Sequence, residues 1–296
     1  MKEIIDLHMH STFSDGSDTP EELLAHVREA GLVLFSLTDH DALNGCGEVQ
    51  KLLQPEDPAF LTGVEFSCRD ERGNYHILGY HYRPDGESIL ETVEKGHRLR
   101  LEKVQARLDF IAEKFGFVFP EEEIRELFAM NNPGKPHIAL LMVKHGYAET
   151  KEQAIREYID QLHLDSAYIR PEEAIRGILG SGGIPVLAHP FFGNGDDLIV
   201  GEQMKERLEY LIVFGLQGVE AFYSGFPPKL NLEMLALAHH HHLFVTAGSD
   251  YHGKNKLIPL GQTGLSRAPL LPKEMSEFLE AVGIEMGKTG KVLKKA

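Results

Sequence analysis

The fold is decided by the stretch Asp6-Leu7-His8-Met9-His10-Ser11, which follows a short apolar run near the start of the chain. Residues two apart in an extended segment point to the same side, so His8 and His10 can face one metal ion together. A second stretch with the same period, Gly248-Ser249-Asp250-Tyr251-His252-Gly253, ends the last predicted strand. In a barrel the first and last strands are neighbours, so these two stretches would deliver four metal ligands to one place.

Further residues of metal-binding type occur at or just after the ends of the other predicted strands. They are Asp15, His40, Glu65, His76 and His189. One such histidine is more often a packing or capping residue than a ligand. Nine ligand-type residues at strand ends are difficult to explain by packing, because a buried ionisable group costs several kcal/mol unless it is paired or bound to a metal.

Short β-rich segments alternate with stretches of helical periodicity, which is the pattern of βα units around a mostly parallel sheet or barrel. The predicted fold class is therefore α/β. Thr19-Pro20-Glu21-Glu22 combines an N-cap residue, a first-turn proline and two acidic residues, and it predicts a helix start. The candidate strands are residues 4–7, 34–38, 60–66, 75–82, 185–188, 218–221 and 243–247.

The alternation stops between residues 84 and 170, where long, charged, helix-favouring residues predict a helical insertion. New helices are expected near Pro120 and Pro136. The insertion either covers the site or is a stabilising appendage. We therefore predict two parts: residues 1–83 with 171–296, and residues 84–170. One apolar stripe is formed by Leu99, Leu101, Val104, Leu108, Ile111 and Phe115.

The composition limits the partners of the protein. A net charge of −15 argues against a broad basic surface for nucleic acid, since such binding depends on many Lys and Arg contacts to phosphates. The start of the chain lacks the features of a signal peptide, and no apolar stretch is long enough for a membrane span, so we expect a cytoplasmic protein. Cys46 and Cys68 follow no metal-binding spacing and are expected to be free thiols.

These motifs resemble those of the PHP (polymerase and histidinol phosphatase) domain phosphoesterases. The matching stretches are Asp6 to Ser11, Thr38-Asp39-His40-Asp41, Gly63-Val64-Glu65, His76, Ala188-His189-Pro190 and Ser249 to His252. The resemblance implies a distorted (β/α)7 barrel with two or three divalent metal ions at the carboxyl ends of its strands. Manganese is favoured among Mn, Fe, Zn and Mg.

The resemblance also implies how the metal ligands are shared. It assigns a first ion to His8, His10, Glu65 and Asp250, a second to Asp15, His40 and His252, and a third to Glu65, His76 and His189. The residues expected to take part in catalysis are Asp15, His40, Glu65, Asp250 and His252. Some family members carry His where Asp15 stands here, and a carboxylate at this position favours harder ions such as Mn²⁺ or Mg²⁺.

A closer likeness is to the stand-alone branch of the family that acts on nucleotide 3′-phosphates and on RNA or oligonucleotide ends. It rests on the insertion, on Gly134-Lys135-Pro136-His137 within it, and on residues 218–224. Lys135 and His137 are the candidate substrate-binding residues; the alternative is an exposed lysine and a histidine at a helix start. Lys135 stands where such proteins often have Arg, so it would act as a point charge.

The hypothesis that follows is phosphate ester hydrolysis by a metal-activated water. The first choice of substrate is the 3′-phosphate of a 3′,5′-bisphosphonucleotide. The alternatives are 5′-3′ exonuclease action on short RNA or DNA, histidinol phosphatase activity, and a non-catalytic metal-binding domain. Asp39 and Asp41 either orient imidazole ligands or belong to a turn. The run from His239 to His242 is predicted to be a solvated helix end, since successive helical residues point in different directions.

Overall fold

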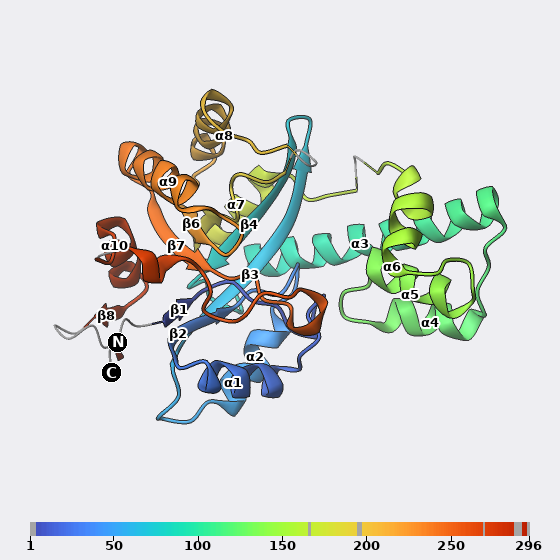
Figure 1. Cartoon of the computed structure of the whole chain (residues 1–296), viewed down its shortest axis with the longest axis horizontal. Coiled ribbons are helices and arrows are strands. Elements are labelled where there is room, and N and C mark those ends of the chain that lie inside the picture. The colour runs from blue at the N-terminus through green and yellow to red at the C-terminus, as the bar shows by residue number, and fades with distance from the viewer. Residues whose placement is uncertain (1–3, 165–166, 194–196, 269, 287–291, 295–296) are drawn as a thin grey trace.

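Seven strands form the central sheet, and their order in space is their order in sequence (Figure 1). The protein is described by a computed structural model that covers residues 4–164, 167–193, 197–268, 270–286 and 292–294. The strands are β1 (Ile4–Asp6), β2 (Leu32–Leu37), β3 (Ala59–Asp70), β4 (Gly73–Tyr80), β5 (Ile184–Leu187), β6 (Gly218–Tyr223) and β7 (Phe244–Gly248). All seven predicted strands are confirmed, with ends that differ by a few residues.

Four of the strand pairs in this sheet are parallel, and β4 alone runs antiparallel to its neighbours. Its pairings with β3 and β5 are antiparallel, whereas β1–β2, β2–β3, β5–β6 and β6–β7 are parallel. The Leu7 amide donates to the Ala247 carbonyl at 2.9 Å, and Met9 forms a parallel bridge with Tyr251 just beyond the strands. These bonds bring the first and last strands side by side, as the barrel prediction requires.

Helices cover the outer side of the sheet. They are α1 (Pro20–Glu29), α2 (Asn44–Leu52), α7 (Pro171–Gly180), α8 (Glu202–Val213), α9 (Pro228–His241) and α10 (Lys273–Ala281). Helix α1 starts at a capping box in which the Thr19 hydroxyl accepts from the Glu22 amide at 3.2 Å and the Glu22 carboxylate accepts from the Thr19 amide at 2.9 Å. Because helices cover it, β2 is buried along nearly its whole length. A small antiparallel pair, β8 (Ile284–Met286) and β9 (Val292–Lys294), follows α10.

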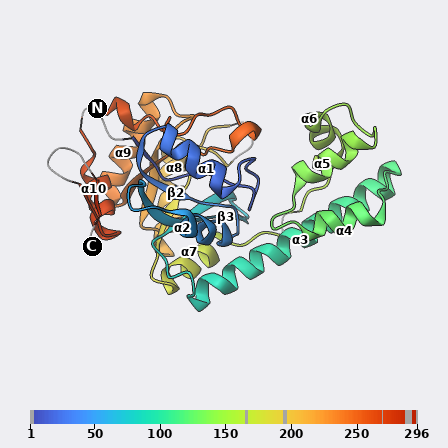
Figure 2. The same ribbon diagram turned by 90° about the horizontal axis from the view of Figure 1, so that it is seen from below.

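The stretch between β4 and α7 is helical, as predicted. It contains α3 (Glu87–Phe115), α4 (Glu121–Ala129), α5 (Lys135–Lys144), α6 (Lys151–Gln153), the π-helix η1 (Ala154–Tyr158) and the 3-10 helix η2 (Ile159–Gln161). Helix α3 is one long rod that leaves the main body and carries the other helices at its far end (Figure 2). Its start packs on the main core through Ile89, whereas Val104, Leu108 and Ile111 belong to a second core shared with α4, α5 and η1.

Expectations for the histidine run and the two cysteines are also met. Helix α9 ends at His241 and is capped by His242 in the left-handed conformation, so the histidine run is a helix end. Cys46 and Cys68 are free and buried. Among the described residues, none of the helices combines the length and apolar character that crossing a bilayer requires.

Candidate metal centre

The nine residues singled out by the sequence meet at one end of the sheet. His8 and His10 follow β1, His40 follows β2, and Glu65 and His76 lie on β3 and β4. Asp15 lies in the loop after β1, His189 follows β5, and Asp250 and His252 follow β7. Strand ends distant in sequence therefore converge on a single site.

The first group surrounds one oxygen of Glu65. Its Oε2 atom lies 3.1 Å from Nε2 of both His8 and His10, and 3.3 Å from Nδ1 of His40. On the other side, Oδ1 of Asp250 lies 3.4 Å from His10 Nε2 and 3.6 Å from His8 Nε2. One ligand atom from each of His8, His10, Glu65 and Asp250 lies within 4.8 Å of all the others, which is the first ligand set expected from the sequence.

The second group is centred on Asp15. Its Oδ1 atom is 3.2 Å from Nε2 of His252 and 3.7 Å from Nδ1 of His10, and its Oδ2 atom is 3.9 Å from Nε2 of His40. All four residues offer ligand atoms within 4.8 Å of one another. His10, which the sequence placed only with the first group, therefore borders both.

The third group uses the other oxygen of Glu65. Its Oε1 atom lies 2.9 Å from Nδ1 of His76 and 3.3 Å from Nε2 of His189, and these two nitrogens are 3.2 Å apart. His40 also joins Glu65 and His76 within 4.8 Å. The structure thus brings all nine residues together, while their roles as ligands stay a prediction.

The residues fit divalent ions, because several of their nitrogen and oxygen atoms are buried without a hydrogen-bond partner. Nε2 of His8, Nε2 of His10 and Oδ1 of Asp15 are buried and have no hydrogen-bond partner. A cation about 2.0–2.2 Å from each ligand requires ligand atoms roughly 3–4 Å apart, which is the spacing found here. Imidazole and carboxylate together suit Zn, Fe and Mn ions.

The electrostatics of the site also favour the binding of cations. Burial alone would lower the pKa of His10, but its contacts with Asp250 and Glu65 raise that pKa to about 10. Burial would raise the pKa of Glu65, but the imidazoles of His8, His40 and His76 hold it well below its usual range. The carboxylates are therefore ionised and the site favours cations, with protons taking their place when no metal is bound.

Three residues of the site adopt a backbone conformation that side chains other than glycine rarely take. Asp41 has φ of 50°, His189 of 26° and Asp250 of 58°. Each lies two to four residues after the end of a strand, namely β2, β5 or β7. Such a conformation typically costs about 1–3 kcal/mol. Such strain persists where the surrounding structure requires a particular side-chain direction.

Glu220 on β6 is a site residue that the sequence analysis missed. This fully buried carboxylate lies with Oε1 2.9 Å from Nδ1 of His8, and its Oε2 accepts from the His189 amide at 2.8 Å. An acceptor at Nδ1 leaves Nε2 of His8 free to face the cluster. The available signal was an acidic residue inside an apolar strand, where an unpaired charge is costly.

A second missed contact lies on the far oxygen of Asp250. Oδ2 of Asp250 accepts from the Tyr223 hydroxyl at 2.9 Å and pairs with the Lys256 ammonium, which itself lies 2.9 Å from the Tyr223 hydroxyl. Because Oδ2 is occupied, Oδ1 is the oxygen directed at the histidines. Lys256 had no sequence motif around it, since its loop meets β6 only in the folded chain.

Asp39 and Asp41 support the site from one step away. Asp39 accepts from the Ser11 amide at 2.8 Å and from the Ser14 hydroxyl at 2.7 Å. Asp41 accepts from the Ser67 amide at 3.2 Å and from Arg100 at 2.5 Å. Within the described part of the chain, neither carboxylate bonds an imidazole directly, but each binds a serine that does: the Ser14 hydroxyl lies 3.3 Å from Nδ1 of His10, and the Ser67 hydroxyl lies 3.3 Å from Nδ1 of His40.

Helices α3 and α5 present positive charge next to this centre. Lys135 at the start of α5 pairs with Asp160, and Nδ1 of His137 accepts from the Gly134 amide at 3.1 Å. Burial lowers the pKa of His137, while the Asp15 charge opposes that change. Both contacts are intramolecular, and the substrate-binding role of the two residues stays a prediction.

The sequence analysis did not identify the other positive residues of this region. We name Arg100, Lys103, Arg107 and Lys135 the basic cluster. Burial, together with the positive charges of Arg100, Arg107 and Lys135, lowers the pKa of Lys103 to about 7. Nε of Arg100 and of Arg107 are buried without a hydrogen-bond partner. The spacing of 100, 103 and 107 on one helix face was the signal available in the sequence.

Comparison with known proteins agrees with this geometry. The PHP domain pattern matches residues 6–170. A phosphoribosyl 1,2-cyclic phosphate 1,2-diphosphodiesterase of Eggerthella lenta is 30% identical over 267 residues, which are 86% of this chain and 97% of that protein. A 3′,5′-nucleoside bisphosphate phosphatase of Chromobacterium violaceum is 30% identical over 260 residues, 84% of this chain and 87% of that protein.

A solved structure is similar over nearly the whole chain. The crystal structure of a Bifidobacterium adolescentis protein, described as a metal-dependent phosphoesterase, has a TM-score of 0.76 and 28% sequence identity. The match covers 94% of this chain and 96% of that one. It includes both the seven-stranded sheet and the helical stretch.

Proposed function

Because this chain belongs to the PHP domain family of metal-dependent phosphoesterases, we propose that it removes the 3′-phosphate from a 3′,5′-bisphosphonucleotide. Hydrolysis of a phosphoric ester is common to the similar proteins. The proposed substrate carries a 5′-phosphate on the same ribose as the 3′-phosphate that is removed. The observation that carries this choice is a second positively charged region, the basic cluster, next to the metal centre.

The nine residues would hold the metal ions in the groups described above. Ions bound there would lower the pKa of a bound water and neutralise the phosphoryl oxygens. The protein's own contribution is orientation. Glu220 fixes the ring of His8, and Tyr223 with Lys256 holds Asp250 so that Oδ1 faces the cluster.

The basic cluster supplies positive charge that its neighbours do not cancel. Its members face only two carboxylates in their described ion pairs, Asp41 and Asp160. Buried like charges repel one another, and an anion of the ligand would relieve that repulsion. A 5′-phosphate bound here, with the 3′-phosphate at the metals, uses both regions at once.

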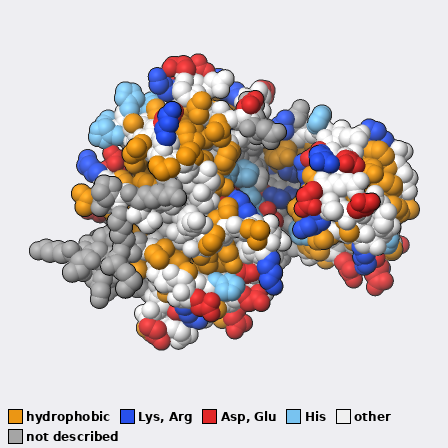
Figure 3. All heavy atoms as spheres, viewed as in Figure 1, with side chains coloured by type: hydrophobic (Ala, Val, Ile, Leu, Met, Phe, Trp, Pro, Cys, Tyr) orange, Lys and Arg blue, Asp and Glu red, His pale blue; other side chains and the backbone are white. Residues whose placement is uncertain are grey.

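The helical insertion would then act as a cover that contributes to the site. Asn132, before α5, donates to the His40 carbonyl at 2.5 Å, and Arg100 on α3 binds Asp41. Lys and Arg side chains and histidines gather in the hollow between the main body and the lobe of α4 to α6 (Figure 3). The proposed division at residues 84–170 therefore places substrate-binding groups on the insertion and metal ligands on the barrel.

Two substrates that differ by one phosphate test the proposal. With Mn²⁺ added, phosphate release from adenosine 3′,5′-bisphosphate is compared with release from 3′-AMP, which keeps the scissile bond but lacks the 5′-phosphate. A charge-assisted contact contributes about 1.5–3 kcal/mol, so kcat/KM should be roughly tenfold to a hundredfold higher for the bisphosphate. In the Arg107→Gln variant this preference should shrink while 3′-AMP hydrolysis persists.

The alternatives predict other results from the same assay. A 5′-phosphorylated dinucleotide, phosphoribosyl 1,2-cyclic phosphate and histidinol phosphate complete the substrate panel. If one of them has the highest kcat/KM, the bisphosphate assignment is wrong. Retained metal without turnover of any substrate would favour a non-catalytic metal-binding role.

A further inference from the structure

Two facing loops carry ligands of the second group of the metal centre, the group centred on Asp15. Asp15 lies in the loop between β1 and α1, and His252 lies in the loop after β7, so neither belongs to a described strand or helix. The 3.2 Å distance from Oδ1 of Asp15 to Nε2 of His252 therefore depends on contacts between the loops. Because loops are more mobile than the elements they connect, ligands held in advance of an ion need further support here.

Asp18 is the centre of a hydrogen-bond network that joins these loops to α1. Its side chain is 8% exposed. Oδ2 of Asp18 accepts from the Tyr251 hydroxyl at 2.7 Å and lies 2.8 Å from Nδ1 of His26 on α1. Its Oδ1 atom accepts from the Ser17 hydroxyl at 2.9 Å. One carboxylate thus links both loops to a helix.

Further contacts hold the two loops close together beside this carboxylate. The Ser17 amide donates to the His252 carbonyl at 3.1 Å, and the Lys254 amide donates to the Ser17 hydroxyl at 2.8 Å. Gly253 has φ of 63°, and a Cβ atom at this position would lie 2.5 Å from Oδ1 of Asp18. The turn after His252 therefore needs a glycine to approach Asp18 this closely.

The charge of Asp18 strengthens the network. Burial alone would raise the pKa of Asp18, but hydrogen bonds from Tyr251, Ser17 and His26 lower it. Burial and the contact with Asp18 raise the pKa of Tyr251 above its ordinary value, so its hydroxyl stays protonated and donates. Hydrogen bonds to an ionised acceptor are about twice as strong as neutral ones. Tyr251 stands between two candidate metal ligands in the sequence, so this anchor limits the movement of both.

From these contacts we infer that Asp18 is a positioning residue of the second metal group. Acting through Tyr251, it holds His252 opposite Asp15 before an ion binds. This role rests on the proposed metal-dependent function, whichever phosphate ester is cleaved. Asp18 would touch neither the ions nor the substrate. Loss of an outer contact of this kind typically lowers metal affinity about 10–100-fold.

Two tyrosine variants form a matched test of this role. Tyr251→Phe removes the hydroxyl that donates to Asp18, whereas Tyr210→Phe removes a hydroxyl on α8 that donates to Asp70 at 2.8 Å. Calorimetric titration measures Mn²⁺ affinity, and EPR spectroscopy distinguishes neighbouring, spin-coupled Mn²⁺ ions from a single ion. Tyr251→Phe should weaken the binding of one ion about tenfold and reduce the spin-coupled signal at limiting Mn²⁺. Tyr210→Phe should change neither.

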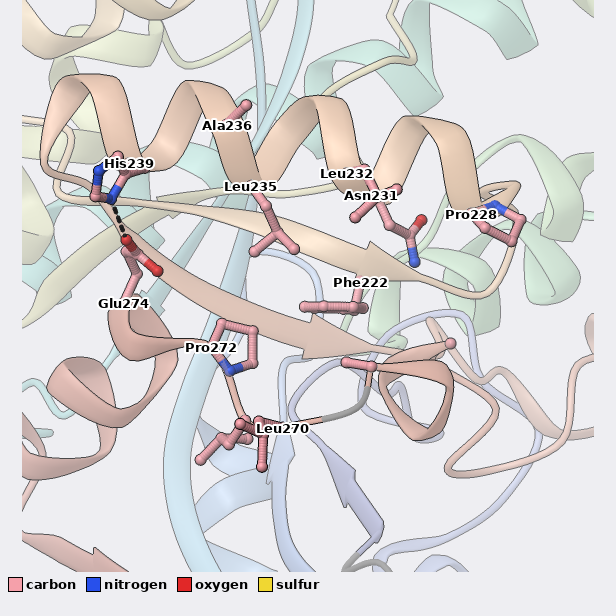
Figure 4. A pocket seen from close by; sticks show the side chains of 13 residues that line it. Phe222, Pro228, Asn231, Leu232, Leu235, Ala236, His239, Leu270, Pro272 and Glu274 are labelled. Atoms are coloured by element: carbon pink, nitrogen blue, oxygen red, sulfur yellow. Dashed lines mark hydrogen bonds and ion pairs between the residues drawn. The ribbon is translucent and has the colours of Figure 1, made fainter.

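Two histidine variants form a second matched pair. Figure 4 shows the contact of His239 on α9 with Glu274, at one end of an apolar pocket on the outer side of β6. Nδ1 of His239 lies 2.8 Å from the carboxylate, the same distance as Nδ1 of His26 from Asp18. His26→Ala should weaken the binding of the same ion as Tyr251→Phe, whereas His239→Ala should leave Mn²⁺ binding unchanged.

A double variant completes the experiment. Asp18→Ala should weaken the binding of one ion about 10–100-fold with the circular dichroism spectrum retained, and adding Tyr251→Phe should weaken it no further, because both changes break one contact. Additive losses, or equal Mn²⁺ affinity of Tyr251→Phe and Tyr210→Phe, would overturn this role of Asp18. Because Mn²⁺ binding is measured without substrate, failure of the bisphosphate assignment does not enter these results.

Discussion

Lys103 is a buried cation whose charge destabilises the folded protein, and its replacement provides a sharp test of the basic cluster. Its side chain is 7% exposed, and its pKa falls from 10.5 to about 7. At pH 7 the protonated form therefore costs about 4 kcal/mol of folding free energy. The Lys103 ammonium lies 3.5 Å from the centre of the Tyr168 ring, and this cation–π contact offsets about 1–2 kcal/mol of that folding cost. Lys103→Met should stabilise the protein by roughly 2–3 kcal/mol at pH 7.

The lowered pKa of Lys103 also predicts how the stability of the fold changes with pH. The folded-state pKa lies below the unfolded value, so the unfolded chain binds more protons between pH 7 and 10.5 and stability rises with pH in that window. Urea unfolding followed by circular dichroism should show this rise in the unmodified protein. It should be smaller in Lys103→Met.

A control and an activity assay complete this test. Lys114→Met, an exposed substitution on the same helix, should leave the stability and its pH slope nearly unchanged. Lys103→Met should also lose part of the preference for adenosine 3′,5′-bisphosphate over 3′-AMP. A Lys103→Met protein that is less stable at pH 7 with the original pH slope would refute the reasoning.

Three further predictions concern the metal centre. Asp250→Asn should lower kcat at least about a hundredfold with the circular dichroism spectrum retained, whereas exposed Asp109→Asn should not; equal activity of the two would disprove the role of Asp250. Glu220→Gln should weaken Mn²⁺ binding about 10–100-fold in calorimetric titrations, and unchanged affinity would contradict the orienting contact with His8. Because the pKa of His10 is raised to about 10, metal must displace protons, so Mn²⁺ affinity should increase from pH 6 to 9; affinity that is constant over this range would count against the ligand assignment.

The sequence predicted most of the fold because its signals are local. Strand residues such as Leu34 and Phe35 form compact apolar runs, and Thr19 begins a helix through chemistry confined to one turn. The period of two in the stretches at residues 6–11 and 248–253 needed only the additional assumption that the first and last strands meet. The Leu7–Ala247 hydrogen bond confirms that assumption.

The missed residues depend on contacts that no short stretch reveals. Lys256 reaches Asp250 only because the loop after β7 folds back beside Tyr223. Members of the basic cluster on α3 look like ordinary helix-surface residues until α5 and the main body bury them. The length of α3 also could not be predicted from the sequence. The start of this helix packs on the main core, and its later turns pack on the second core.

Glu65 would make the proposed ion positions of the centre depend on one another. Its two oxygens contribute to the first and third groups, while His10 and His40 each border the group of Asp15. An ion that binds in one group therefore changes the charge and orientation of ligands that another group shares. The proposed ligands come from both ends of the chain, so metal binding would also favour the state in which β1 and β7 are joined. Ions bound only to that state stabilise the folded protein in proportion to the logarithm of their concentration, and folding and metal loading are then a single linked equilibrium.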